Sequence, residues 1–131
     1  MRIASLALLA LLGAAPVVAQ PLTIPAGETW IFSLADGQPT KARKTNPNAK
    51  PSRGEIKVTV LTMMGTTLTA SSNIPDAYTL RAKLVGANGK AAPARTCTLP
   101  PSGRPVLESW PQKAIAVRVG DFKPAADPGA C

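Results

Sequence analysis

The chain has 131 residues, of which 14 are proline and 10 are glycine, and a formal net charge of +8 at pH 7. It contains no histidine, which excludes Ser-His-Asp and Cys-His nucleophiles, a histidine general base and histidine-ligated metal sites. The length allows one domain, or one domain preceded by a removable segment.

Residues 1–19 have the pattern of a secretory signal peptide. Arg2 gives a short positive region, an apolar run extends over residues 3–15, and Pro16 ends that run. The run is short for a membrane span, which needs about 20 residues. A cleaved signal peptide is therefore the prediction, and a retained membrane anchor is the alternative.

The end of this segment also predicts where it is cut. Val17 and Ala19 place modest or small side chains at the positions that a signal peptidase reads, so we predict cleavage between Ala19 and Gln20. Removal leaves residues 20–131 in a secreted or periplasmic compartment.

Cys97 and Cys131 are the two cysteines of the chain. In an oxidising compartment two cysteines most simply form one disulfide, and we predict the pair Cys97–Cys131. Such a bond ties down the Pro/Gly/Ala-rich residues 123–130. Pairing between chains through Cys131 is the alternative, and a redox role is disfavoured because there is no C-x-x-C motif.

Residues 20–131 alternate apolar and polar side chains with the period of a β-strand, and they lack helical periodicity. The clearest patterns predict strands over 29–34, 55–61, 78–85 and 113–119, and weaker ones over 66–70, 94–99 and 106–110. Glycine-containing turn pairs separate these strands: Asp36-Gly37, Met64-Gly65, Asn88-Gly89, Ser102-Gly103 and Gly120-Asp121. We expect a hairpin at Asn88-Gly89.

These strands predict an all-β fold, a single antiparallel β-sandwich of immunoglobulin-like architecture or a small barrel. Membership of the immunoglobulin family is not predicted, because Cys131 follows Trp110 too closely for the inter-sheet disulfide of that family. Leu, Ile, Val and Phe make up 21 of the 112 residues from 20 to 131, so a disordered chain is the alternative.

Residues 41–53 hold five cations and no acid: Lys41, Arg43, Lys44, Lys50 and Arg53. Their prolines and asparagines predict an exposed loop. We interpret the charges first as a solvated loop that favours solubility. The alternative is a contact with an anionic envelope polymer or an envelope protein. Nucleic acid is disfavoured because no aromatic side chain is interleaved with the cations.

Other side chains that could bind a metal or a partner are more simply interpreted as structural. Met63-Met64 lacks further soft ligands for copper, so we predict that both pack in the core or on the surface. Trp30 is predicted in the core with Phe32 and Leu34, whereas Trp110 is equally consistent with a core and a contact role. None of the acids forms a local pair with another acid in the sequence, and none belongs to a calcium loop. The acids are Glu28, Asp36, Glu55, Asp76, Glu108, Asp121 and Asp127.

Glu108 is predicted on the solvent face of its strand, and a buried acid is the alternative. No coherent catalytic set remains, and we expect neither a metal nor a cofactor. The sequence thus favours an exported, non-catalytic binding or accessory module of the cell envelope. The alternatives are a structural subunit that pairs through a sheet edge and a small envelope hydrolase that uses carboxylates.

The intact mass of the protein in an envelope fraction tests the predicted cleavage. We expect a chain that begins at Gln20 and lacks the first 19 residues, because the peptidase reads Val17 and Ala19. A chain that still carries Met1 contradicts the signal peptide and favours the anchor.

Overall fold

The computed structural model describes residues 20–127 and 129–131, and the predicted signal peptide lies outside these residues. The described chain contains strands and no helix: β1 (Leu22–Pro25), β2 (Thr29–Ala35), β3 (Gln38–Thr45), β4 (Glu55–Thr62), β5 (Thr66–Ser72), β6 (Tyr78–Val85), β7 (Ala91–Ala94), β8 (Val106–Trp110) and β9 (Ala116–Pro124). One antiparallel sheet has four strands in the order β1-β9-β6-β7, and the other has five in the order β3-β2-β4-β5-β8.

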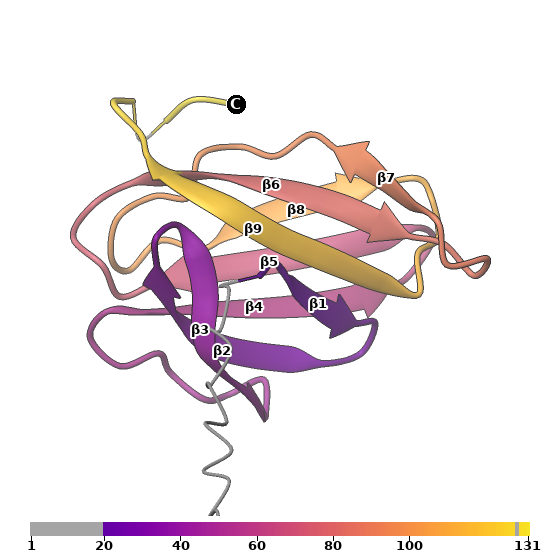
Figure 1. Ribbon diagram of the computed structural model, residues 1–131, viewed down its shortest axis with the longest axis horizontal. Coiled ribbons are helices and arrows are strands. Elements are labelled where there is room, and N and C mark those ends of the chain that lie inside the picture. The colour runs from indigo at the N-terminus through magenta and orange to yellow at the C-terminus, as the bar shows by residue number, and fades with distance from the viewer. Residues whose placement is uncertain (1–19, 128) are drawn as a thin grey trace, which may run out of the picture.

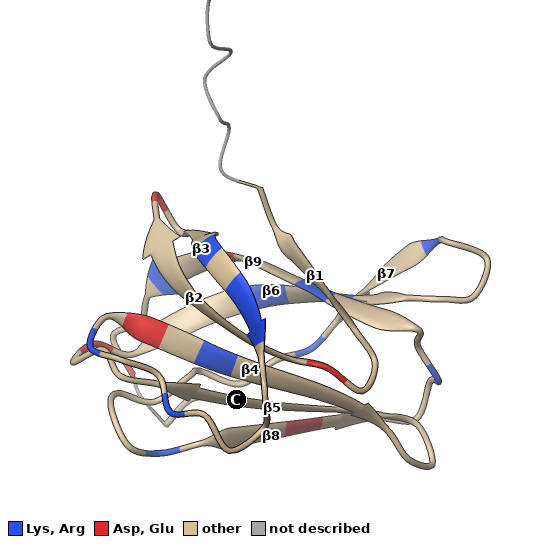
Figure 2. Ribbon diagram, turned by 90° about the horizontal axis from the view of Figure 1, so that it is seen from below, with Lys and Arg blue, Asp and Glu red and all other residues tan. Residues whose placement is uncertain are grey.

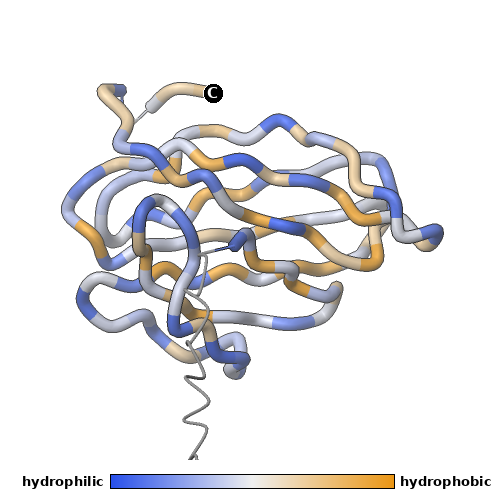
Figure 3. Tube along the Cα trace, viewed as in Figure 1, coloured by the Kyte–Doolittle hydropathy of each residue, from blue (hydrophilic) through white to orange (hydrophobic). Residues whose placement is uncertain are grey.

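The two sheets stack as a β-sandwich, with β1, β9 and β6 nearer to the viewer than β4, β5 and β8 in Figure 1. Hydrophobic and hydrophilic residues alternate along β6 and β9 (Figure 3), so that each strand turns one face inward. The inward side chains form one hydrophobic core, whose fully buried members include Ile24, Phe32, Ile56, Leu68, Leu99 and Val117.

The strands predicted over 29–34, 55–61, 66–70, 78–85 and 106–110 are confirmed as β2, β4, β5, β6 and β8. Strand β4 shows why: Ile56, Val58 and Val60 are buried, and the residues between them are not. The predicted hairpin at Asn88-Gly89 is also confirmed, because it joins the paired strands β6 and β7.

The prediction of a strand over 94–99 is wrong. The strand β7 ends at Ala94, and the next residues leave the four-stranded sheet. Leu99 alone returns to it, in a single antiparallel bridge with Tyr78. Only Thr98 and Leu99 of this segment are buried, and the fully buried Leu99 belongs to the core between the sheets.

The last strand is also longer than predicted. It begins at Ala116 and runs to Pro124, and the predicted turn at Gly120-Asp121 lies within it. There the pairing with β6 shifts register, and Asp121 has a φ of 53°. Asp tolerates the left-handed region better than most residues, so this pair forms a β-bulge instead of a chain reversal.

Two strands were not predicted. Strand β1 is four residues long and buries one large side chain, Ile24. Strand β3 is an edge strand whose residues from 41 to 44 are all exposed, so it has no apolar alternation. The interpretation of 41–53 as a loop is therefore wrong for Lys41, Arg43 and Lys44, which lie in β3, and right for Lys50 and Arg53.

One seam between the sheets is closed by hydrogen bonds from the β2–β3 hairpin. The Gln38 side-chain amide donates to Asp121 Oδ1 at 2.5 Å and accepts from the Asp121 backbone N–H at 3.2 Å. The Phe122 N–H donates to the Gly37 carbonyl at 2.7 Å. Beneath these contacts the Phe32 and Phe122 rings meet edge to face, with centroids 5.7 Å apart.

The opposite seam, between β7 and β8, is half closed by residues 95–99, which we call the seam segment. Trp110 Nε1 donates to the Arg95 carbonyl at 3.0 Å, and the Thr96 hydroxyl donates to the Leu80 carbonyl at 2.9 Å. Leu99 exchanges two backbone hydrogen bonds with Tyr78. The seam segment is thus anchored to a strand of each sheet.

Glu108 lies in this seam and not on the solvent face, so its prediction is wrong. It shares the inward face of β8 with Trp110 and is 8% exposed, whereas Leu107 is 66% exposed on the other face. The inward placement of the large indole fixes which residues of β8 point inward. Glu108 Oε1 accepts the Cys97 N–H at 2.6 Å, which offsets part of the cost of its burial.

The predicted disulfide is confirmed as an intrachain bond between Cys97 and Cys131, whose Cα atoms are 4.0 Å apart. The Thr98 N–H donates to the Ala130 carbonyl at 2.8 Å beside it. The two contacts fasten the C-terminal residues to the seam segment.

Replacing both cysteines by alanine tests the contribution of this bond. We expect the free energy of unfolding in urea to fall by about 3.5–4 kcal/mol, because the bond closes a loop of 34 residues in the unfolded chain. An unchanged urea midpoint contradicts this role.

Candidate functional site

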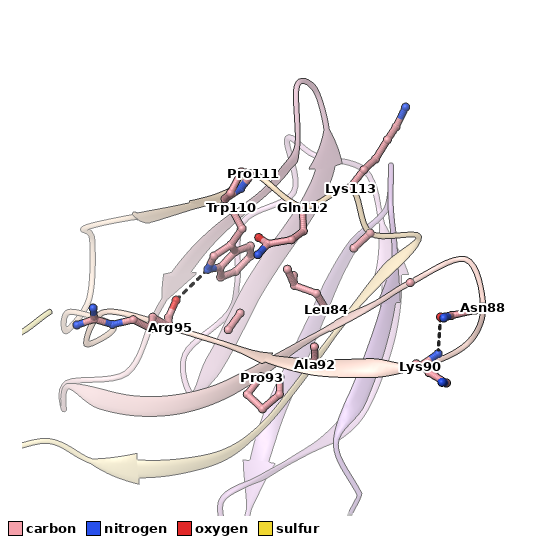
Figure 4. A pocket seen from close by; sticks show the side chains of 13 residues that line it. Leu84, Asn88, Lys90, Ala92, Pro93, Arg95, Trp110, Pro111, Gln112 and Lys113 are labelled. Carbon is pink, nitrogen blue, oxygen red and sulfur yellow. Dashed lines mark hydrogen bonds between the residues drawn. The ribbon is translucent and has the colours of Figure 1, made fainter.

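The other half of the β7–β8 seam is open and forms a cavity of about 530 Å³. Figure 4 shows it between β7 and the residues that follow β8. A volume of this size lies within the range of small-ligand sites. We call it the seam cavity.

The interior of the seam cavity is largely apolar. Its lining includes Leu84, Ala114 and Trp110, all of which are buried, and the exposed Ala92 and Pro93 of β7. The hydrogen bond from Trp110 Nε1 to the Arg95 carbonyl fixes the orientation of the indole. An apolar ligand group entering here therefore meets a preformed surface.

The mouth of the seam cavity is basic. Lys90, Arg95 and Lys113 line it and are exposed, and Arg95 and Lys113 extend outward from its rim in Figure 4. No acid is among the described residues that line it, and none of these three cations forms an ion pair within the part of the chain that the structure describes. The mouth is thus suited to an anionic group.

One wall of the cavity is held by Thr66, which is fully buried at the start of β5. Its hydroxyl donates to the Gln112 carbonyl at 2.7 Å and accepts the Ala114 N–H at 2.8 Å. Gly65 packs so closely that a Cβ would lie 2.3 Å from the Trp110 carbonyl oxygen. The loop after β8 is fixed by these contacts.

The other wall is the β6–β7 hairpin. The Gly86 N–H donates to the Lys90 carbonyl at 2.9 Å, and Asn88 Oδ1 accepts the Lys90 N–H at 3.0 Å (Figure 4). Gly89 has a φ of +80°, which favours glycine at this turn. Both walls thus owe their shape to hydrogen bonds within the chain.

The basic residues predicted as a contact region lie elsewhere, around β3 (Figure 2). Arg43 forms a bidentate pair with Glu55, with nitrogen–oxygen distances of 2.5 and 3.0 Å, and Lys44 lies 3.8 Å from Glu28. Lys41, Lys50 and Arg53 are exposed and form no ion pair with described residues. Their proposed contact with a partner stays a prediction.

The Arg43 pair has a marked effect on Glu55. The hydrogen bonds from Arg43, followed by one from the Ser52 N–H, lower the pKa of Glu55 from 4.5 to about 2. Part of the charge of β3 is therefore neutralised by an acid that stays ionised over most of the pH range.

The aromatic and methionine side chains differ in part from expectation. Trp30 is half-buried at the margin of the core and donates from Nε1 to Glu28 at 3.0 Å, whereas Trp110 is 9% exposed and belongs to the core. Met63 and Met64 lie on the surface at the β4–β5 turn and not in the core, with exposed fractions of 76% and 105%.

The seam cavity could not be predicted from the sequence. The Asn88-Gly89 turn is recognisable and Trp110 is consistent with two roles, but Lys90, Arg95 and Lys113 are isolated cations in the sequence. Lys90 and Arg95 directly flank β7, and the stacking of the two sheets brings Lys113, between β8 and β9, to the same cavity.

Comparison of the chain with protein-family models, with curated proteins and with solved structures finds no match. Within the described residues there is no helix long and apolar enough to cross a membrane, and no group of three or more Cys, Asp or Glu side chains suited to a metal ion.

The dependence of stability on pH tests the pair between Arg43 and Glu55. A lowered pKa in the folded state stabilises the protein above the ordinary value of 4.5, and this contribution is lost as the pH falls toward 2. We therefore expect Glu55→Gln to be less stable than the wild type at pH 6, and the difference to shrink between pH 5 and 2. A difference that is constant across this range in urea unfolding contradicts the pair.

Proposed function

We propose that the protein is an exported, non-catalytic binding module of the cell envelope that takes a small amphipathic anion in the seam cavity. Export rests on the predicted signal peptide of residues 1–19, and the disulfide is compatible with an oxidising compartment. The observation that carries the binding role is the combination of a preformed apolar interior with a basic mouth.

The cavity suggests how such a ligand lies. Its apolar body packs on Leu84, Ala92 and the edge of Trp110, which removes apolar surface from water. Its anionic group stays at the mouth, within reach of the flexible side chains of Arg95 and Lys113. Exposed charge pairs of this kind contribute up to about 1 kcal/mol each, so the apolar contact supplies most of the affinity.

The alternative of assembly through a sheet edge has less support. Pro25 lies in β1 and Pro93 in β7, and Pro105 and Pro111 flank β8. The remaining edge strand, β3, presents lysine and arginine. Proline and basic side chains are features that protect edges from pairing.

The hydrolase alternative also has less support. No acid of the described chain lines the seam cavity. Among the described residues Glu108 is the buried acid, and it is hydrogen-bonded to the Cys97 N–H as part of the seam. A glycosidase-like mechanism needs two carboxylates across a cleft.

Three ligands with the same eight-carbon chain test the proposal by calorimetry: octanoate, octanol and octylammonium. We expect octanoate to bind most tightly and octylammonium least, because the mouth is basic. Replacing both Arg95 and Lys113 by serine should weaken octanoate by about threefold to tenfold and leave octanol unchanged. Ala92→Trp, which fills the cavity from an exposed strand position, should abolish binding of both.

The matched control is the Lys41→Ser/Lys50→Ser variant. It also loses two positive charges, but neither residue lines the cavity, so it should bind octanoate as the wild type does. Equal affinities for the three ligands, or unaltered binding by Ala92→Trp, would refute the seam cavity as a ligand site.

A further inference from the structure

The outer face of the four-stranded sheet carries basic side chains that the seam cavity does not use. Arg81 and Lys83 are the exposed residues between the buried ones of β6, and Arg118 is the partly exposed residue between Val117 and Val119 of β9. Basic positions along β6 are marked in Figure 2. We call Arg81, Lys83 and Arg118 the cationic track.

The register of the sheet places like charges opposite each other. Lys83 is the direct cross-strand partner of Arg118, and Arg118 is in turn paired with Thr23 of β1. Like charges in this arrangement destabilise a sheet. Within the described chain no acid forms an ion pair with the cationic track. Asp121 lines a hollow beside these cations, but it accepts a hydrogen bond from Gln38. A bound anion would offset this repulsion.

The surface along the cationic track is hollowed. A hollow of about 110 Å³ is lined by these three cations together with Pro21, Gly120 and Asp121. A second hollow, of about 240 Å³, shares Arg81 and Lys83 with the first, and it shares Pro93 and Ala94 with the seam cavity. The two hollows therefore adjoin each other at Arg81 and Lys83, and their linings come from β9, β6 and β7.

We propose that the cationic track binds a linear polyanion, a polymer that carries a phosphate or carboxylate group at each repeat, with its chain running across β9 and β6. The guanidinium group of arginine forms two parallel hydrogen bonds with either a phosphate or a carboxylate. Each exposed contact is weak, but contacts with successive groups of one chain add through effective concentration. The proposal does not depend on a ligand in the seam cavity.

Two other anionic partners fit this face less well. The described residues of the cationic track and its hollows include no aromatic side chain on which bases could stack. The large exposed apolar side chains of the described chain are Leu61, Met63, Met64, Leu107 and Ile115, and none lines these hollows. The protein would thus insert no large apolar side chain into a membrane at this face.

Binding of the oxidised protein to linear inorganic polyphosphate and to a polyuronate tests the proposal. Affinity is measured by fluorescence anisotropy at several salt concentrations. We expect at least one of the two polymers to bind, orthophosphate alone to bind far more weakly, and the affinity to fall steeply with salt. The Arg81→Gln/Lys83→Gln/Arg118→Gln variant should lose about tenfold or more in affinity and show a shallower salt dependence.

The Lys41→Gln/Lys50→Gln/Arg53→Gln variant is the matched control, with the same loss of three charges at exposed positions that have no ion pair with described residues. We expect it to lose less than about twofold. Circular dichroism checks that both variants keep the wild-type sheet spectrum, and octanoate binding by the first variant should be unchanged, which separates this site from the seam cavity.

Three results would overturn the proposal: equal losses in the two variants, a larger loss in the control, or no binding of either polymer. Tighter binding of anionic phospholipid vesicles, or of single-stranded DNA with the same number of charges, than of polyphosphate would also overturn it, since such preference requires contacts other than charge.

Discussion

The seam segment, residues 95–99, is the constraint on which the arrangement of the two sheets depends. In the five-stranded sheet, Trp110 donates its indole N–H to the Arg95 carbonyl, and Glu108 accepts the Cys97 N–H. In the four-stranded sheet, the Thr96 hydroxyl donates to the Leu80 carbonyl of β6, and Leu99 pairs with Tyr78. The disulfide then joins it to the C-terminal residues. Because this short stretch covers only part of the seam, the same contacts that hold the sheets together leave the rest open. The cavity is thus a by-product of how the sandwich is closed, and the indole that fastens the seam also lines the opening.

The charges of the molecule are divided between two regions. The chain has fifteen basic and seven acidic residues, so ion pairs can neutralise only a minority of the cations. The two ion pairs among described residues both involve β3, through Glu55 and Glu28. The cations of the four-stranded sheet and of the cavity mouth are left without such partners. Arg43 and Lys44 are therefore less available to an anion than the cations that have no ion pair among the described residues.

The period-two pattern was sufficient to predict the strands whose inner and outer faces differ clearly, such as β4 and β6. It was not sufficient for β1, which is too short to show a period, or for β3, an edge strand with exposed residues on both faces. Glu108 could not be placed from its neighbours, because its burial depends on the N–H of Cys97, which is brought to it by the fold. The disulfide was predictable because the chain has two cysteines, which leave a single intrachain pairing.

The candidate sites depend on contacts between residues far apart in the sequence. The cluster at 41–53 was conspicuous because its cations are adjacent, yet the structure pairs two of them with acids. Lys83 and Arg118 are 35 positions apart and become neighbours only through the register of β6 with β9. Local composition reveals charges that are adjacent in the sequence, whereas a sheet also brings distant charges together through its register.

The prolines and basic residues on the edge strands have a consequence for the behaviour of the protein at high concentration. Cross-β fibrils grow when an unprotected edge accepts an identical strand from another molecule and the addition is repeated. Each outermost strand of the described chain has a proline within or beside it. The edges of the folded molecule are therefore poor templates for the repeated strand addition by which fibrils elongate.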